Sequence, residues 1–168
     1  MKRTNLTRLL VVALFGALLA MSLGGCMAQN NTVNTQQTEN RQYMSKVNQS
    51  MEDLTNRLDS FNQAVSNNDL VGMKTQADNA FKAIDDLNAL EAPEALKDIQ
   101  TAYVDGCTDL KDALSLYVDL YTEIESATEE EPFDYSTYDA RLKEIQDKYD
   151  SGIDKLEEAD KKANEMPN

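Results

Sequence analysis

The side chains of this 168-residue chain that could take part in covalent, acid–base or metal chemistry are two cysteines, Cys26 and Cys107, and a large set of carboxylates. Aspartate and glutamate number 30, and histidine is absent. Without histidine the chain cannot form a Ser/His/Asp triad, a Cys/His pair, an HExxH zinc site or a CxxCH haem attachment. Carboxylate pairs arise by chance on acidic helices. We therefore predict a protein that is not an enzyme and has no catalytic residues, metal or cofactor.

The residues before Cys26 give it a specific chemistry. A basic start leads into an apolar run from Leu9 to Ala20, and Leu23-Gly24-Gly25 then directly precedes the cysteine. This order resembles the lipobox of bacterial lipoprotein signal peptides. In that family the cysteine is acylated, with palmitate among its chains, and becomes the first residue of the mature protein. The resemblance implies a signal peptide at 1–25, lipidation at Cys26 and attachment to the extracytoplasmic face of the cell membrane.

Two other interpretations of this segment stay open. An uncleaved membrane anchor needs about 20 apolar residues, and the run from Leu9 to Gly25 has only 17. Ordinary signal peptidase cleavage after Ala28 would instead release a soluble protein.

Several acyl chains, each CH₂ contributing ~0.8 kcal/mol, would make attachment through Cys26 stable. Met27 is not the aspartate that resembles an inner-membrane retention signal, so sorting to an outer membrane also stays open.

The net charge narrows the choice of partners. The first 25 residues carry three bases and no acid, so their removal leaves 143 residues with 13 basic and 30 acidic side chains, a formal net charge of −17. Such a surface disfavours nucleic acid and anionic lipid. A cationic partner or divalent ions stay open. We expect no nucleic-acid partner, a membrane contact made through the lipid on Cys26, and an envelope protein as the partner.

Composition divides the mature chain into a tether and a domain. Residues 27–40 are polar and contain too little apolar surface to order themselves. With the lipidated Cys26 they are predicted to form a disordered tether, 26–40. The remaining residues, 41–168, are predicted to form one helical domain.

Four segments of this domain have apolar residues at alternating spacings of three and four, which predicts amphipathic helices. The apolar stripes run from Met44 to Val65, from Leu70 to Leu87, from Leu96 to Ile124 and from Tyr138 to Ala163. Helix breaks are expected at Asn67-Asn68-Asp69, at Pro93 and at Pro132. Asp69 is predicted to cap the second helix, and Ser136 with Asp139 to form a capping box for the fourth.

Long helices with short connections favour antiparallel neighbours, so we predict an all-α, up-and-down four-helix bundle. A three-helix bundle, with the first two segments merged or the first undocked, is the alternative. Heptads shared between chains, as in a coiled coil, leave the oligomeric state open. Acid–base pairs spaced by four residues mark the water-facing side of the fourth helix: Asp139/Lys143, Glu144/Lys148, Glu157/Lys161 and Glu158/Lys162.

Two glycines, Gly106 and Gly152, occupy stripe positions where leucine would be expected. If the last two helices form a hairpin that turns near residue 131, Gly106 lies opposite Leu156 and Gly152 opposite Leu110. We therefore predict close packing of large against small residues. The alternative is a slot near Gly106 and Cys107 that admits an apolar ligand. Cys107 itself is predicted to be buried, since an unpaired thiol behaves as a small hydrophobe; a reactive or intermolecularly bonded thiol is the alternative.

Four tyrosines lie near the connection between the last two helices: Tyr117, Tyr121, Tyr135 and Tyr138. They are expected to gather at one end of the bundle. Amphipathic rings of this kind can close the core where helices splay. They can also form a contact patch, since tyrosine is enriched at interfaces, and the neighbouring acids would suit a cationic peptide or partner protein.

A second resemblance covers about residues 70–125. The phrase Leu90-Glu91-Ala92-Pro93-Glu94-Ala95-Leu96, followed by Tyr103 and Cys107, resembles small helical bacterial lipoproteins, a family without an assigned activity. Together these features predict a membrane-anchored extracytoplasmic lipoprotein that acts as a cell-envelope interaction or structural module. The alternative is a helical lipoprotein that binds a small ligand, an ion or a wall fragment between its helices.

Overall fold

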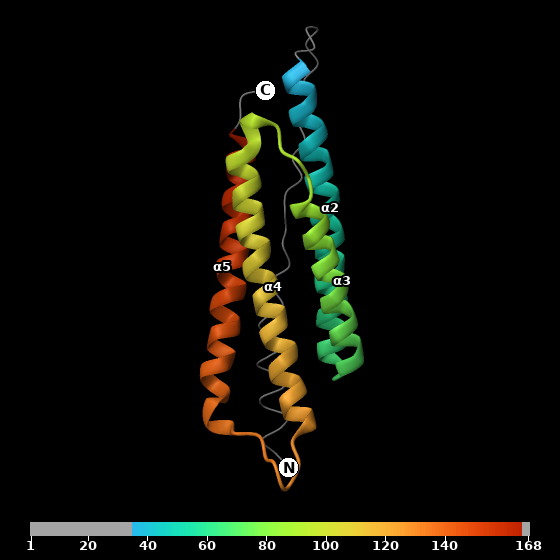
Figure 1. Cartoon of the computed structure of the whole chain (residues 1–168), viewed down its shortest axis with the longest axis vertical. Helices are drawn as coiled ribbons and strands as arrows, with labels where there is room; N and C mark the ends of the chain where they lie inside the picture. Colours follow the sequence, from blue (N-terminus) through green and yellow to red (C-terminus); the bar gives the residue numbers. More distant parts are fainter. Residues whose placement is uncertain (1–34, 166–168) are drawn as a thin grey trace.

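The computed structural model describes residues 35–165, and these residues form four long helices (Figure 1). The helices are α2 (Thr35–Ser66), α3 (Leu70–Asn88), α4 (Lys97–Ser126) and α5 (Tyr138–Asn164); the 3₁₀ turns η1 (Glu94–Leu96) and η2 (Tyr135–Thr137) precede α4 and α5. The predicted all-α four-helix bundle is confirmed. The predicted signal peptide, Cys26 and residues 27–34 of the predicted tether lie outside the described residues. Within 35–165, no helix combines the length and the apolar character needed to cross a membrane.

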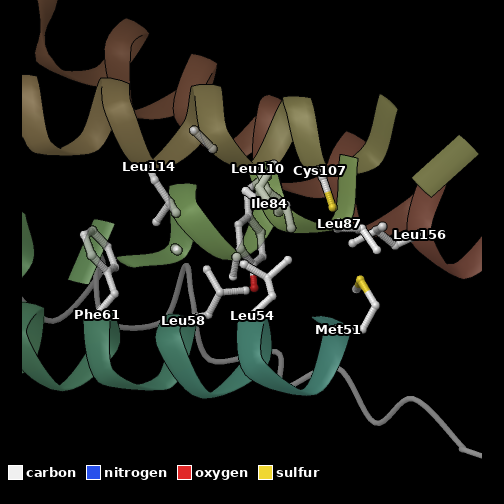
Figure 2. Close-up of a cluster of buried hydrophobic side chains, with 14 of the residues drawn as sticks. Met51, Leu54, Leu58, Phe61, Ile84, Leu87, Cys107, Leu110, Leu114 and Leu156 are labelled. Atoms are coloured by element: carbon white, nitrogen blue, oxygen red, sulfur yellow. The ribbon is translucent and has the colours of Figure 1, made fainter. Parts of the chain in front are cut away.

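The helices alternate in direction, and α3 packs between α2 and α4 while α4 packs along α5 (Figure 1). Side chains from all four helices point into one core, where Leu54, Phe61, Leu110 and Leu156 are almost fully buried (Figure 2). The three-helix alternative is wrong. The first segment is docked, and a turn separates it from the second.

The turn between α2 and α3 follows from its sequence. Asn68 has a φ of 54°, a left-handed conformation that asparagine tolerates better than most residues. The amide of Asp69 donates back to the Ala64 carbonyl at 2.9 Å, which closes the end of α2. The Asp69 carboxylate then accepts from the Gly72 amide at 2.9 Å, so the predicted N-cap is confirmed.

Helix α2 begins at Thr35, whereas the composition predicts that the domain begins at residue 41. Residues 35–40 are therefore helical and do not belong to a disordered tether. Once Tyr43 and Val47 pack in the core, each upstream residue adds one helical hydrogen bond without a new nucleation cost. Apolar content cannot reveal this effect, because helix propagation needs only a formed neighbouring turn.

The capping box predicted for the fourth helix is wrong. The structure uses Asp134 instead, whose carboxylate accepts from the Ser136 amide at 2.9 Å and begins η2. Helix α5 then starts after Thr137 without a side-chain cap. The aspartate thus caps the 3₁₀ turn that precedes α5, two residues before the amide that it accepts from, and not the first turn of α5 itself.

Helices α4 and α5 approach closely at the two glycines. A Cβ atom at Gly106 would lie 2.8 Å from Leu156 Cγ and 3.0 Å from the Gly152 carbonyl oxygen. A Cβ atom at Gly152 would lie 2.9 Å from both the Gly106 carbonyl oxygen and Leu110 Cγ. The predicted pairing of glycine with leucine is confirmed. The slot considered near Gly106 is filled by Leu156.

A polar cluster that the sequence did not predict crosses the same α4–α5 interface. Asp109 of α4 is only 9% exposed, and its carboxylate accepts hydrogen bonds from Ser151 and Lys155 of α5, each at 2.6 Å. Lys148 lies 3.4 Å from Asp109 and 3.0 Å from Asp112. The bases on α5 thus face acids on α4 as well as water.

This cluster changes the ion pairs expected along α5. Of the four predicted pairs, Glu158 with Lys162 is present at 2.8 Å. Lys143, predicted to pair with Asp139, instead contacts Asp147, four residues further along the helix, at 2.6 Å. Lys148 reaches across to α4. Spacing within one helix cannot show which bases have an acid on the neighbouring helix.

Asp109 links the stability of the bundle to pH. Burial alone would raise the pKa of Asp109, but the hydrogen bonds of Lys155 and Ser151 and the nearby lysine charges outweigh it and hold the pKa below its ordinary value. A lowered folded-state pKa stabilises the fold above about pH 4, the value in the unfolded chain, and this contribution is lost as the pH falls through the folded-state value.

Replacing Asp109 with asparagine should therefore lower the free energy of unfolding by about 2 kcal/mol at pH 7, because charge-assisted hydrogen bonds are lost. The difference from the native chain should shrink below about pH 4. Urea unfolding of both chains at pH 7 and pH 3 measures it. Asp150→Asn, at an exposed position on α5, is the control and should show little difference at either pH. An equal deficit for Asp109→Asn at both pH values would contradict the assignment.

Cys107 is fully buried on the inner face of α4, as predicted, and burial raises the pKa of its thiol to about 12 (Figure 2). A protonated thiol without solvent access is a poor nucleophile. In a Cys26→Ser chain, where Cys107 is the only cysteine, we expect a water-soluble thiol reagent to react only as fast as the protein unfolds. Rapid labelling in native buffer would contradict this, and labelling in denaturant is the control.

Candidate contact surface at the aromatic end

The connection between α4 and α5 lies at one end of the bundle (Figure 1), and it contains the aromatic residues Phe133 and Tyr135. We call Tyr121, Phe133, Tyr135 and Tyr138 the aromatic end. Three of these rings pack on one another at their edges: Phe133 lies 5.0 Å from Tyr135 and 6.4 Å from Tyr138, with interplanar angles of 83° and 86°. Tyr135 and Tyr138 are 6.4 Å apart. Three aromatic rings of the connection and of the start of α5 therefore form a packed cluster, and the connection is not an extended polar loop.

The four predicted tyrosines do gather at this end, but they have different surroundings. Tyr117 is 3% exposed and packs edge to face on Phe61 of α2, with ring centroids 5.6 Å apart. Tyr121 stacks on Tyr117, and its hydroxyl donates to the Asn68 side chain at 3.0 Å. Tyr117 is therefore part of the core. Tyr121 joins α4 to the α2–α3 turn.

Tyr135 is the ring that the solvent reaches most easily, with 67% of its surface exposed. Tyr138 is partly buried, and burial, with smaller effects from Asp139 and the neighbouring tyrosines, raises its pKa. The exposed part of the candidate contact surface is thus smaller than the predicted set of four tyrosines. It centres on Tyr135, with Tyr138 and Phe133 beside it.

The sequence interpretation missed Phe133, because it considered tyrosines only. Phe133 follows Pro132 in a connection otherwise rich in acids, outside every helical stripe. A large apolar residue at such a position has no helix face to bury it, and this is a signal for a local cluster. In the structure Phe133 is the ring that contacts both Tyr135 and Tyr138.

Local hydrogen bonds order the connection that holds the rings. The Thr128 amide donates to the Glu131 carbonyl at 3.0 Å, and the Glu131 amide donates to the Thr128 hydroxyl at 3.0 Å. The Asp134 carboxylate then accepts from the Ser136 amide at the start of η2. The connection is thus held by hydrogen bonds on both sides of Phe133. These contacts hold the rings in place without covering them.

Acidic groups surround the aromatic end. Glu129, Glu130, Glu131 and Asp134 are all exposed within the connection. At its base, Arg141 of α5 makes a two-pronged ion pair with Glu123 of α4, one contact being 2.9 Å. The hydrogen bond and charge of Arg141 lower the pKa of Glu123. The arginine charge is thereby engaged by α4, while the acids of the connection remain open to solvent.

A further exposed apolar residue lies at this end of the bundle. Val71, in the first turn of α3, is 76% exposed, and with Tyr135 it makes up the exposed large hydrophobic residues of the described chain. Val71 follows the α2–α3 turn, and Tyr135 lies in the α4–α5 connection. The turn and the connection are at the same end of the bundle, because Tyr121 of α4 donates a hydrogen bond to Asn68 of the turn. Both exposed large hydrophobic residues of 35–165 thus lie at the end that carries the rings.

The remaining chemistry of the described residues is limited. Within 35–165, no group of three or more cysteine, aspartate and glutamate side chains is arranged to hold a metal ion. Cys26, the predicted lipidation site, lies outside these residues. No protein-family model, curated protein or solved structure matches the chain.

Proposed function

We propose that the protein is a lipid-anchored extracytoplasmic interaction module that presents the aromatic end to an envelope protein. Lipidation at Cys26 attaches the chain to the membrane, and the bundle acts as a rigid spacer. The single observation that carries the proposal is the position of the exposed rings at the opposite end of the bundle from the start of α2.

The spacing supports a contact away from the membrane. Helix α2 has 32 residues, which at 1.5 Å per residue is about 48 Å long. It runs from Thr35 to the turn that Tyr121 contacts. Eight residues, 27–34, separate Cys26 from Thr35, and even fully extended they reach only about 28 Å. An acylated Cys26 would thus hold the start of α2 within about 28 Å of the membrane, and a bundle standing upright on this tether would present the aromatic end at the end away from the membrane.

The core supports an interaction module over the ligand-binding alternative. Leu156 occupies the space beside Gly106 where an apolar ligand would have to enter. Exposed apolar surface lies instead at the aromatic end, which is where surface area is free to be buried by a partner. Tyrosine suits such a contact because its ring is apolar and its hydroxyl polar.

Site-specific cross-linking in intact cells tests the proposal. A photo-reactive phenylalanine analogue would replace Tyr135 in one chain and Glu91, exposed near the start of α4, in a second. We expect position 135 to capture one recurrent envelope protein that position 91 does not capture. Captured proteins would be identified by mass spectrometry.

Removing the anchor supplies the control. In a Cys26→Ser chain with the same analogue at position 135, the protein should leave the membrane fraction and capture should fall sharply. Capture that is equal from positions 135 and 91, or absent from both with the protein folded, would overturn the interaction surface. A Cys26→Ser chain that stays in the membrane fraction although its first 25 residues have been removed would overturn the lipid anchor.

A further inference from the structure

We propose that the aromatic end binds a basic polypeptide segment, one that carries several lysine or arginine side chains. This inference rests on the proposed function and names the chemistry of the partner. It follows from the charge around the exposed rings, from the packing of the rings and from the charge of the whole chain.

The charge along the connection that carries the rings is of one sign. From Asp112 to Ala140 the chain contains nine acidic residues and no lysine or arginine. The first base after this stretch is Arg141, which is paired with Glu123. A partner that approaches Tyr135 therefore meets carboxylates from the connection and has no repelling cation among residues 112–140. Complementary charge of this kind steers association and selects against acidic partners.

The exposed rings complement the same chemistry. A lysine or arginine that lies over the face of a tyrosine or phenylalanine is attracted by the ring quadrupole. The fold already contains such a contact, since Lys111 lies 5.3 Å from the ring centroid of Phe81. Tyr135, at 67% exposure, has ring surface available for a cation from outside. Aromatic surface flanked by carboxylates suits a side chain with an apolar stem and a cationic head.

The arrangement of the rings favours a polypeptide over a small cation. A cage for one small cation needs rings that stand apart and face a common centre. Here Phe133 packs edge to face on both Tyr135 and Tyr138. The three rings therefore contact one another and do not surround a common centre. The carboxylates, from Glu129 to Asp134, are spread along the connection. Such a surface has separate positions for several cations, as a basic chain segment would supply.

Other occupants fit the charge less well. A second copy of this chain would bring two acidic ends together, each with Glu129, Glu130 and Glu131 exposed. Nucleic acid and anionic lipid are repelled in the same way. A basic segment is the class of macromolecule that both the carboxylates and the rings attract.

A fluorescent basic peptide tests the inference. The chain contains no tryptophan, so a twelve-residue peptide of lysine, arginine and glycine with one tryptophan can be followed by its own emission. The full chain would be titrated in neutral detergent at low ionic strength. Tyr135→Ala should weaken peptide binding by about fivefold, a loss of about 1 kcal/mol. Tyr135→Phe, which keeps the ring, should bind like the native chain.

The carboxylates are tested by two variants with the same net charge. Glu129→Gln/Glu130→Gln/Glu131→Gln removes three acids at the aromatic end, while Glu91→Gln/Asp98→Asn/Glu157→Gln removes three exposed acids towards the other end. The first variant should weaken binding at least fivefold more than the second. Equal weakening would show attraction to total charge only and would overturn the inference.

The outcomes separate this inference from the proposed function. If the peptide does not bind, or if spermidine competes as well as the peptide does, the basic-segment inference is overturned. Cross-linking from position 135 would still capture an envelope protein if the interaction module is right. If position 135 captures nothing in cells, the proposed function fails whatever the peptide does.

Discussion

Replacing Gly152 with leucine is expected to lower the free energy of unfolding by about 3 kcal/mol or more, because it overpacks the α4–α5 interface. The first added carbon would already lie 2.9 Å from the Gly106 carbonyl oxygen and from Leu110 Cγ. Backbone atoms cannot rotate away as a flexible side chain can, so the two helices must separate. The melting temperature should fall by about 10 °C for a domain of this size. Thermal and urea unfolding, followed by circular dichroism, measure both quantities.

Ala140→Leu is the matched control, since Ala140 is exposed on the same helix. Adding the side chain there should change stability by less than about 0.5 kcal/mol. Similar stability for Gly152→Leu and Ala140→Leu would contradict the close approach of α4 and α5. A large loss in Gly152→Leu alone would support it.

Replacing Phe61 with alanine should cost about 3 to 5 kcal/mol, the range for a buried phenylalanine. Phe61 of α2 is fully buried and packs edge to face on Tyr117 of α4. Its ring points from α2 into the core (Figure 2), so its loss would leave a cavity between α2 and α4. Urea unfolding at pH 7 measures the change.

Phe133→Ala makes the same change of phenylalanine to alanine at the aromatic end, and its effect is compared with that of Phe61→Ala. Phe133 is only partly buried and contacts Tyr135 and Tyr138 within one connection. We expect a cost of about 1 kcal/mol, similar to the worth of an aromatic pair. If the two alanine variants lost equal stability, the first helix would not be docked as the structure has it.

Much of the fold could be predicted from spacing alone. Apolar residues at steps of three and four predict each helix, and the residues that end them, from Asn67 to Asp69 and at Pro132, interrupt the helices for local reasons. The pairing of Gly106 with Leu156 and of Gly152 with Leu110 also followed from the sequence. A hairpin has one variable, the position of its turn, and once this is known the opposite residues are determined.

The candidate contact surface was less predictable. Four tyrosines lie close along the chain, but Tyr117 is 3% exposed and Tyr135 is 67% exposed. Whether a ring lies inside depends on the neighbouring helix, here on Phe61 from α2. Sequence spacing places the rings at one end of the bundle. It does not determine which of them that helix covers.

The sequence by itself determined the helical fold, the turns, the small-to-large packing of α4 on α5 and the acidity of the chain. These are local or periodic properties, which one segment expresses without its neighbours. Only the tertiary structure decided the Asp109 cluster, the helical state of residues 35–40 and the exposure of each ring. Each of these depends on atoms that are distant in the chain or on a helix already packed, because burial and charge pairing are properties of the assembled helices.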